Sequence, residues 1–342
     1  MHYFVTGASG FIGRRLVKAL LQRRGATVHF LIRPGSEGKL EALYAYWGVS
    51  RKRAIPVPGD LTQRRLGVSA ATLRDLKGRI DHVYHLAAVY DLTADAAAQM
   101  RTNVEGTRQV VQFAQAIGAR HLHHVSSIAA AGLYPGVFRE DMFDEARGLQ
   151  HPYFKSKHES ERVVRTECKL PWTIYRPALV VGDSHTGEMD KVDGPYYFFK
   201  LIQRLRDSLP SWMPLVGIEG GRINIVPVNF VVAALDTISH HHARGSGGCF
   251  HLVHPTGWRV GEVLDIFARA AHAPKLNVYI NAGLAEAIPL LLRRSLAVAT
   301  PLKNLRSALL QELGLPEDIL TFVNYPTRFD RSRTDEALKG SY

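Results

Sequence analysis

The sequence predicts an α/β protein in which a doubly wound parallel sheet is followed by a smaller, mainly helical lobe. Short β-rich runs alternate with helical patterns through residues 1–130, as strands and crossover helices do in parallel sheets. A glycine-rich turn at residues 6–13 joins the first β-rich run to an amphipathic helix. We assign residues 1–182 to the sheet domain, with returning segments near 223–241 and 248–254, and most of 183–342 to a cap lobe.

Each element is expected from its own apolar pattern. After the glycine turn, Phe11, Leu16 and Leu20 are spaced to form one buried helix face. The expected strands are 2–6, 27–32, 54–57, 82–86, 122–126 and 173–175, and the expected helices are 11–24, 40–47, 95–117 and 152–168. After residue 182 the pattern predicts helices at 196–209, 230–241 and 260–271 and extended pieces at 223–228 and 250–253.

The composition is that of a soluble globular chain, with 46% hydrophobic and 22% charged residues among 342. The two cysteines, Cys168 and Cys249, lie far apart, which favours a reducing, cytoplasmic setting. We expect no signal peptide, and no apolar run reaches the ~18–20 residues that cross a bilayer. The net charge of +12 is scattered, which favours a merely solvated basic surface, with attraction of anionic ligands as the alternative. No nucleic-acid partner is expected, because the sequence contains no recognised DNA- or RNA-reading motif.

The run at residues 288–310 leaves two interpretations open. It mixes apolar residues with Arg293, Arg294, Lys303 and Arg306. Such a run either rests on an anionic membrane surface or forms a cap helix whose cations reach solvent, and the second is favoured. The protein is therefore expected in the cytoplasm, with peripheral membrane contact as the open alternative.

The glycine turn has the spacing of a dinucleotide-binding loop, Thr6-Gly-Ala-Ser-Gly-Phe-Ile-Gly13. Gly7 permits a sharp turn, Gly10 permits close approach of a pyrophosphate, and Gly13 permits close packing of helix on strand. The helix that follows presents unpaired N–H groups and the positive end of its dipole to that anion. A strand–turn–helix context makes this a Rossmann-type site rather than an ordinary turn.

The end of the second expected strand indicates which dinucleotide binds. An NAD site usually carries an acidic residue there for the ribose 2′-hydroxyl. This chain has Arg33 instead, and a guanidinium suits the 2′-phosphate of NADPH. Lys39 is a possible second contact, although a solvated lysine is the simpler interpretation. The expected cofactor is NADPH.

Tyr153 and Lys157 lie four residues apart at the start of a predicted helix, so both face one side. A phenol has a pKa of roughly 10, and a nearby ammonium favours the phenolate. Such a tyrosine can give its proton to a carbonyl oxygen while hydride arrives at the carbon. Ser126 and Ser127 follow the fifth expected strand, where a hydroxyl could donate to the substrate oxygen or simply form a turn.

No metal site is predicted. The histidines at 121, 123 and 124 and at 240–242 lack the further ligands at fixed spacing that a metal requires. We interpret them as packing or surface residues.

Together these motifs resemble the extended branch of the short-chain dehydrogenase/reductase superfamily. The matching stretches, in family order over residues 1–182, are 6–13, 59–61, 85–88, 103–107, the two serines, Tyr-x-x-x-Lys and 176–177. The resemblance implies that Ser127, which lies five residues before Gly132, is the catalytic serine, with Tyr153 and Lys157. The cofactor contacts predicted from the loop, from charge and from the resemblance are Thr6, Gly7, Ser9, Gly10, Phe11, Ile12, Gly13, Arg33, Lys39, Asp60, Leu61, Leu86, Ala87, Ala88, Asn103, Tyr153, Lys157 and Pro177.

Within this branch the chain is most similar to the N-terminal reductase module of bacterial fatty acyl-CoA reductases and their thioester-reductase relatives. The supporting stretches are 85–91, 123–132, 187–199, 217–227 and 324–330. The resemblance implies reduction of a long-chain acyl-CoA, a fatty aldehyde or both, and a second reductase module in a longer enzyme. It also implies that the cap lobe binds the alkyl chain, with the aromatic run 196–199 lining an acyl pocket; periodicity alone fits core packing equally well.

Two other interpretations remain open. Other extended-branch enzymes use the same three catalytic residues on a nucleotide sugar, a steroid or a flavonoid ketone. Alternatively, the protein is an NADP-sensing scaffold without chemistry, although such relatives typically lack the tyrosine–lysine pair that this chain has.

Overall fold

The computed structural model describes residues 1–89, 95–190, 196, 198–212, 215–219, 222–241, 247–274, 276–281 and 325–341. The chain divides into two compact units. The first unit comprises Met1–Asp190, Val226–Pro255 and Thr327–Tyr342, and the second comprises Lys191–Ile225 and Thr256–Pro326. The first unit therefore extends beyond residue 182 and takes back the C-terminal segment, which the sequence pattern assigns to the cap lobe.

The first unit is built on a seven-stranded sheet with the order β12-β7-β5-β4-β1-β2-β3. Every neighbouring pair in this sheet is parallel, so the predicted doubly wound α/β fold is confirmed. The strands are β1 (His2–Thr6), β2 (Thr27–Ile32), β3 (Ala54–Pro58), β4 (His82–His85), β5 (His121–Val125), β7 (Trp172–Pro177) and β12 (Gly248–Leu252). From β1 the strands β2 and β3 are added on one side, and β4 and the later strands are added on the other, so the strand order switches between β1 and β4. In open parallel sheets, ligands bind at the carboxyl ends of the strands beside such a switch point.

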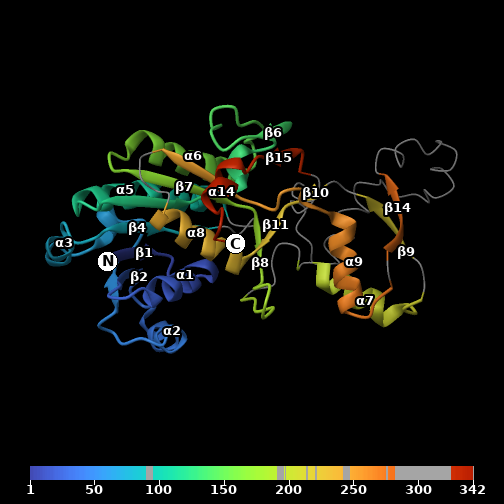
Figure 1. The fold of residues 1–342 in the computed structure, drawn as a ribbon, viewed down its shortest axis with the longest axis horizontal. Coiled ribbons are helices and arrows are strands. Elements are labelled where there is room, and N and C mark those ends of the chain that lie inside the picture. The colour runs from blue at the N-terminus through green and yellow to red at the C-terminus, as the bar shows by residue number, and fades with distance from the viewer. Residues whose placement is uncertain are drawn as a thin grey trace. The chain divides into compact units, whose positions relative to one another are not determined.

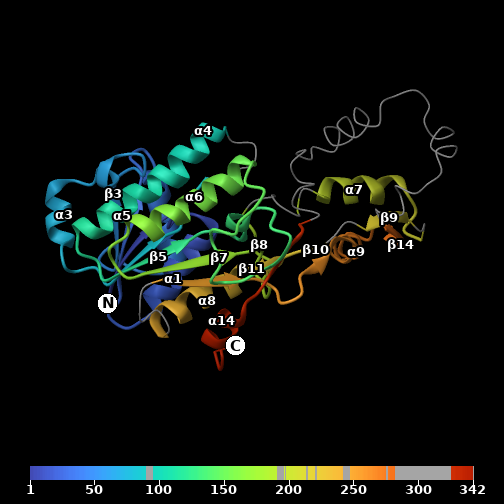
Figure 2. The ribbon, with the colours of Figure 1, turned by 90° about the horizontal axis from the view of Figure 1, so that it is seen from above.

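Helices cover both faces of this sheet (Figures 1 and 2). One face carries α1 (Phe11–Gln22) and α8 (Val228–His241), and the other carries α5 (Gly106–Ala116) and α6 (Pro152–Glu167). The expected helix at 95–117 is divided into α4 (Ala96–Gln99), a π-helical turn at Met100–Glu105 and α5. A π-helical turn inside a helix often marks a functional site.

Smaller elements complete the first unit. Two of them were predicted: α2 (Leu40–Trp47), with these bounds, and β11 (Ile225–Pro227), within the extended piece 223–228. The others are the short helix Arg64–Gly67, α3 (Ala70–Leu76), the short helix Ile128–Ala131, the parallel pair β6 (Gly136–Phe138) and β15 (Thr327–Phe329), β8 (Leu179–Val181), which pairs with β11, and α14 (Ser332–Ala337).

The two faces of the sheet differ in character because side chains alternate along each strand. On the α5/α6 face, Phe4 packs on Phe113 in a mainly aliphatic core. On the α1/α8 face the core is built from polar rings, among them His123, stacked between His121 and Tyr84 with centroids 4.4 and 4.6 Å away. The adjacent histidines in β5 are thus strand residues packed in the core.

The second unit contains α7 (Phe199–Ser208), α9 (Val260–Ala270) and two small sheets. The sheets pair β9 (Leu215–Glu219) with β14 (Leu276–Asn281) and β10 (Arg222–Ile223) with β13 (Trp258–Arg259). Tyr196, Phe199 and Phe267 form an aromatic cluster with centroid separations of 5.0–6.0 Å. The run 288–310 and Tyr197 lie outside the described residues.

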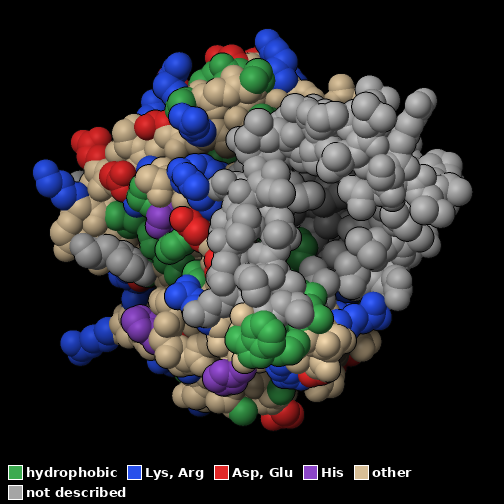
Figure 3. Space-filling view, turned by 90° about the vertical axis from the view of Figure 1, so that its right-hand side faces the viewer, with side chains coloured by type: hydrophobic (Ala, Val, Ile, Leu, Met, Phe, Trp, Pro, Cys, Tyr) green, Lys and Arg blue, Asp and Glu red, His purple; other side chains and the backbone are tan. Residues whose placement is uncertain are grey.

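Within the described ranges, none of the helices combines the length and apolarity needed to span a bilayer. On the face drawn in Figure 3, Lys and Arg side chains of the described residues are dispersed in several places rather than gathered in one patch.

Candidate active site

The glycine turn folds so tightly that side chains are excluded from it. A Cβ on Gly7, whose φ is +76°, would lie 2.7 Å from the backbone nitrogen of Ala87. A Cβ on Gly13 would lie 2.0 Å from the carbonyl oxygen of Gly7. Gly10 caps α1 without a side-chain hydrogen bond, so the first N–H groups of the helix face a turn made only of backbone. This cradle fits the pyrophosphate of a dinucleotide.

The predicted loop contacts surround this cradle. Ser9 and Gly10 are exposed, and Phe11 and Ile12 are half-buried at the start of α1. Thr6 is fully buried, and its hydroxyl lies 3.4 Å from the backbone nitrogen of Ala87. The half-buried segment Leu86-Ala87-Ala88 follows β4 directly and so lies beside the turn. The structure thus places β1, α1 and the end of β4 together as predicted.

Arg33 and Asp60 follow the neighbouring strands β2 and β3 at the carboxyl edge. Arg33 is solvent-exposed, and Lys39 is exposed in the short helix Glu37–Lys39. Asp60 accepts hydrogen bonds from the backbone nitrogen and hydroxyl of Thr62 at 2.8 and 2.7 Å. These bonds, assisted by the charge of Arg33, lower the pKa of Asp60. Leu61 lies beside Gly106 of α5, whose Cβ would be 3.4 Å from the Leu61 Cβ.

A row of polar side chains crosses the carboxyl end of the sheet on its α5/α6 face. Thr6, His85 and His124 lie on adjacent strands, paired Thr6 to His85 and His85 to His124. Arg176 of β7 and His251 of β12 are likewise paired, whereas His124 is paired with Ile174, two residues before Arg176. We call Thr6, His85, His124, Arg176 and His251 the polar row. It lies beside the aliphatic core in which Val163 and Val164 of α6 pack with Ile174.

Tyr153 and Lys157 lie above the polar row in the first two turns of α6. Pro152 begins the helix and the His151 ring accepts a hydrogen bond from the Tyr153 nitrogen, so the start of α6 is capped locally. Tyr153 is half-buried, whereas Lys157 is only 5% exposed and its Nζ lies 5.9 Å from the centre of the Tyr153 ring. Burial lowers the pKa of Lys157 to about 8, and the charge of Glu161 opposes this shift.

The two serines after β5 differ in their burial: Ser126 is buried and Ser127 is half-buried. Ser126 is buried close to Glu161, and its proximity makes a small contribution to the lowered pKa of that carboxyl. Ser127 is half-buried at the start of the short helix Ile128–Ala131, and its oxygen accepts a bond of 3.2 Å from the Ala129 nitrogen. The Ser127 hydroxyl therefore keeps its proton for donation to a ligand. His158 fixes this turn to α6 through a 3.0 Å bond with the Ala130 carbonyl.

Asn103 connects the segment after β4 to the catalytic helix. It lies in the π-helical turn, is 2% exposed, and exchanges two 2.8 Å hydrogen bonds with the backbone of Val89. Its amide also donates to the Ser156 hydroxyl at 3.1 Å, and Ser156 donates to the Tyr153 carbonyl. The contacts present are positioning contacts, and direct contact of Asn103 with the cofactor stays a prediction.

His85 was not among the predicted site residues, although its motif was. Its ring bridges the hydroxyls of Thr6 and Thr107 at 2.8 and 3.0 Å. Burial, together with the charges of His124 and Lys157, lowers the pKa of His85 well below its usual value, so the ring is neutral. It therefore ties the glycine turn to α5. The sequence signal for its role was its position at the end of a strand, directly before the predicted cofactor contacts Leu86, Ala87 and Ala88.

Glu161 and Arg176 form a fully buried ion pair next to this site. Arg176 donates from Nε and Nη2 to the carboxylate at 2.7–3.2 Å. Burial opposes ionisation of Glu161, but the Arg176 guanidinium outweighs it and lowers the pKa of Glu161 to about 2. Pro177, one of the predicted cofactor contacts, is the buried residue that ends β7 directly after Arg176.

Among the described residues, no group of three or more His, Cys, Asp or Glu side chains could hold a metal ion. His82, His121 and His123 instead contact one another and neighbouring hydroxyl groups, for example Thr173 at 2.9 Å from His121.

The chain is similar in sequence to several known proteins. The chain is 32% identical over 267 residues to one of the subunits of linear gramicidin synthase from Brevibacillus parabrevis, covering 73% of this chain and 5% of that protein. It is 28% identical over 273 residues to aldehyde reductase lnbA of Aspergillus flavus, covering 74% of this chain and 26% of that protein. The chain thus spans a small part of both relatives.

A third relative matches along most of its length. Sterol demethylase protein B of Methylococcus capsulatus is 30% identical over 328 residues, which cover 92% of this chain and 89% of that protein.

Among solved structures, the terminal R domain of the myxalamid PKS-NRPS biosynthetic pathway is similar, with a TM-score of 0.75 and 26% identity. The alignment covers 99% of this chain and 85% of that domain. Residues 5–235 match the family described as male sterility protein, whose sequence model is one of NAD binding. The chain therefore belongs to the male sterility protein family, as an NAD(P)-binding oxidoreductase of the extended short-chain dehydrogenase/reductase class.

Proposed function

We propose that this protein catalyses the NADPH-dependent reduction of a fatty aldehyde, a fatty acyl-CoA or both. The observation that carries the proposal is the pair of side chains on α6: a half-buried Tyr153 and a buried Lys157, whose Nζ lies 5.9 Å from the centre of the Tyr153 ring. A phenol needs a neighbouring cation to exchange protons near neutral pH, and this helix supplies one.

The proposed chemistry follows from these groups. NADPH, when bound, supplies hydride to the carbonyl carbon. The Tyr153 phenol gives its proton to the carbonyl oxygen, and Lys157 stabilises the negative charge that the phenol oxygen acquires. Ser127 donates its hydroxyl proton in a hydrogen bond to the same substrate oxygen. With an aldehyde the product is the alcohol; with a thioester the resulting hemithioacetal expels the thiol and gives the aldehyde.

The preference for NADPH is proposed from charge. Arg33 is exposed at the end of β2, at the position where an NAD site usually places an acid, and Lys39 follows six residues later. A guanidinium there can bind a 2′-phosphate with two hydrogen bonds.

Reduction of an aldehyde or a thioester is supported by the similarity to an aldehyde reductase and to the terminal R domain of a biosynthetic pathway. A fatty substrate is proposed from the sequence resemblance to fatty acyl-CoA reductases. In that case the second unit binds the alkyl chain, and the aromatic cluster of Tyr196, Phe199 and Phe267 is a candidate surface. Each buried methylene contributes about 0.8 kcal/mol, so chain length should change KM strongly.

The test is to follow NADPH oxidation with palmitoyl-CoA, hexadecanal, butanal, a ketosteroid and a sugar nucleotide in parallel. The proposal predicts turnover of the long-chain thioester or aldehyde and a much higher KM for butanal. Tyr153→Phe should abolish turnover while cofactor affinity, measured by NADPH fluorescence, stays unchanged. Equal activity with butanal and hexadecanal would remove the lipid assignment, and undiminished turnover by Tyr153→Phe would remove the mechanism.

A steroid carbonyl is the second candidate substrate. The match along nearly the whole length of a sterol demethylase protein favours it, because the other two relatives match over a small part of their length. Turnover of the ketosteroid without turnover of either lipid substrate would select this candidate.

The protein's location and partners follow from the same proposal. A cytoplasmic reductase of long-chain substrates would meet them at a membrane surface, and a second reductase module would act on its aldehyde product. Co-sedimentation with anionic and neutral liposomes tests the membrane contact, which should need anionic lipid.

A further inference from the structure

Glu161 lies one helical turn after Lys157 on the buried side of α6. The two side chains are 0% and 5% exposed. A buried ammonium needs a partner charge, because desolvation otherwise favours its neutral form. Two histidines feel the charge of Lys157, His85 of β4 and His124 of β5, and burial keeps both neutral. On α6 itself, Tyr153 lies one turn before Lys157 and Glu161 lies one turn after it.

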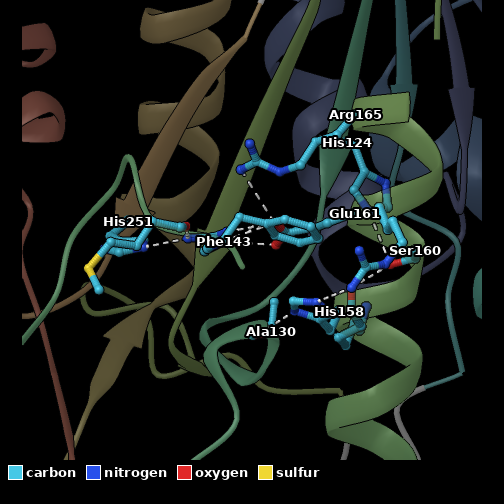
Figure 4. A network of polar contacts seen from close by, with 12 residues as sticks. His124, Ala130, Phe143, His158, Ser160, Glu161, Arg165 and His251 are labelled. Carbon is cyan, nitrogen blue, oxygen red and sulfur yellow. Dashed lines mark hydrogen bonds and ion pairs between the residues drawn. The ribbon is translucent and has the colours of Figure 1, made fainter. Parts of the chain in front are cut away.

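Glu161 is itself fixed by charged groups from two elements. Arg176 of β7 binds both carboxylate oxygens, and Arg165 of α6 lies 3.7 Å away. Burial raises the pKa of Cys249 on β12, so this neighbour is a neutral thiol. Figure 4 shows Glu161 and Arg165 on α6 within this network.

Arg176 is held in turn by the C-terminal part of the first unit. His251 lies 2.6 Å from the Asp330 carbonyl through Nδ1, which must therefore donate. Its Nε2 is then the acceptor of the Arg176 Nη1 proton at 3.2 Å, while Nη1 also donates to the Met142 carbonyl. The guanidinium thus has one orientation, which presents two N–H groups to Glu161. Glu140 reaches the same segment by accepting bonds from the backbone of His251 and the hydroxyl of Thr334.

We propose that Glu161 is a positioning residue of the reductase: its carboxylate, fixed by Arg176, is the counter-charge that keeps the Lys157 ammonium charged beside Tyr153. The role rests on the proposed function, because the charge matters only where Lys157 works with Tyr153. It assigns a purpose to the Arg176–Glu161 pair beyond holding α6 on the sheet.

The direction of the effect follows from charge. The pKa of Lys157 is about 8 with Glu161 in place, and loss of the carboxylate lowers it further. Lys157 then loses its proton at lower pH, so the alkaline decline of cofactor binding and turnover moves toward neutral pH. An opposite charge nearby changes a pKa by about 1–3 units, so the expected displacement is about one pH unit.

The experiment compares two variants that separate charge from structure. Glu161→Gln alone leaves a buried guanidinium unpaired, whereas Glu161→Gln combined with Arg176→Met removes both charges and restores packing. Glu159→Gln, the same change at a partly exposed position of α6, is the matched control. For each protein, melting temperature, NADPH affinity by fluorescence and kcat and KM are measured across the pH range.

Glu161→Gln is expected to bind NADPH at mildly acidic pH and to lose binding at a pH about one unit below that of wild type. In the double variant the positive charge of Arg176 is removed as well, so its profile should move less than that of Glu161→Gln. The control should follow the wild-type profile. A folded Glu161→Gln variant with the wild-type profile overturns the proposal. If Glu161→Gln does not fold, Glu161→Asp carries the test: it withdraws the carboxylate by one methylene, and an unchanged profile again overturns the proposal.

The binding titration needs no substrate. If no tested carbonyl compound is turned over, the proposed function fails, while the displacement of the binding profile still decides the role of Glu161.

Discussion

Acid should destabilise this fold because its buried histidines are neutral. The pKa of His121 sets how much unfolding free energy one such residue loses on acidification. His121 is 6% exposed, and burial lowers its pKa from 6.5 to about 4. Because the folded-state value lies below the unfolded one, the unfolded chain takes up the proton first. The stability that neutral His121 contributes is therefore complete above about pH 6.5 and is lost as the pH falls toward about 4.

The two pKa values set the size of the effect. At about pH 5 the difference costs about 2 kcal/mol of unfolding free energy. His29 is equally buried and has its pKa lowered to about 4, so the pair together cost about 4 kcal/mol. That is a large fraction of a typical total of about 5–15 kcal/mol.

The assay is urea unfolding followed by circular dichroism between neutral pH and about pH 5. His121→Gln removes the titrating ring and keeps an amide for Thr173, which contacts His121 at 2.9 Å. This variant should lose about 2 kcal/mol less than wild type on acidification. His185→Gln, in an exposed loop, should behave as wild type. An identical pH dependence in His121→Gln and wild type would refute the reasoning.

The remaining predictions concern the cofactor site and the C-terminal segment. Gly13→Ala should lower the unfolding free energy by about 1–3 kcal/mol and weaken NADPH binding, because the new Cβ would meet the Gly7 carbonyl. Thermal melting measures the change, and Gly38→Ala, which adds a Cβ in open space, is the control. Arg33→Ala should raise KM for NADPH and leave KM for NADH unchanged, and an unchanged NADPH preference in steady-state kinetics would contradict this. Glu140→Gln should destabilise the fold by about 1–3 kcal/mol in urea unfolding, because a buried amide cannot accept all four bonds that the carboxylate accepts.

Local patterns were sufficient for the parts of the site that are local. The glycine turn depends on a strand, a tight turn and a helix that follow one another, and Tyr153 and Lys157 depend on a four-residue helical spacing. The strands β1 and β2 were predicted with the bounds that the structure shows. Helix 95–117 was predicted as continuous, because periodicity alone does not reveal a π-helical turn.

The sequence by itself determined the fold class, the glycine turn and the Tyr153–Lys157 pair, since each is specified by neighbours within one turn or one strand. Only the tertiary structure decided that Thr6, His85, His124, Arg176 and His251 lie at the same edge of the sheet. Their proximity arises from strand order and side-chain alternation across a parallel sheet, where residues far apart in the chain become neighbours. The partner of Glu161 and the neutral state of His251 follow from that row, because burial and the groups packed around a charge set its protonation.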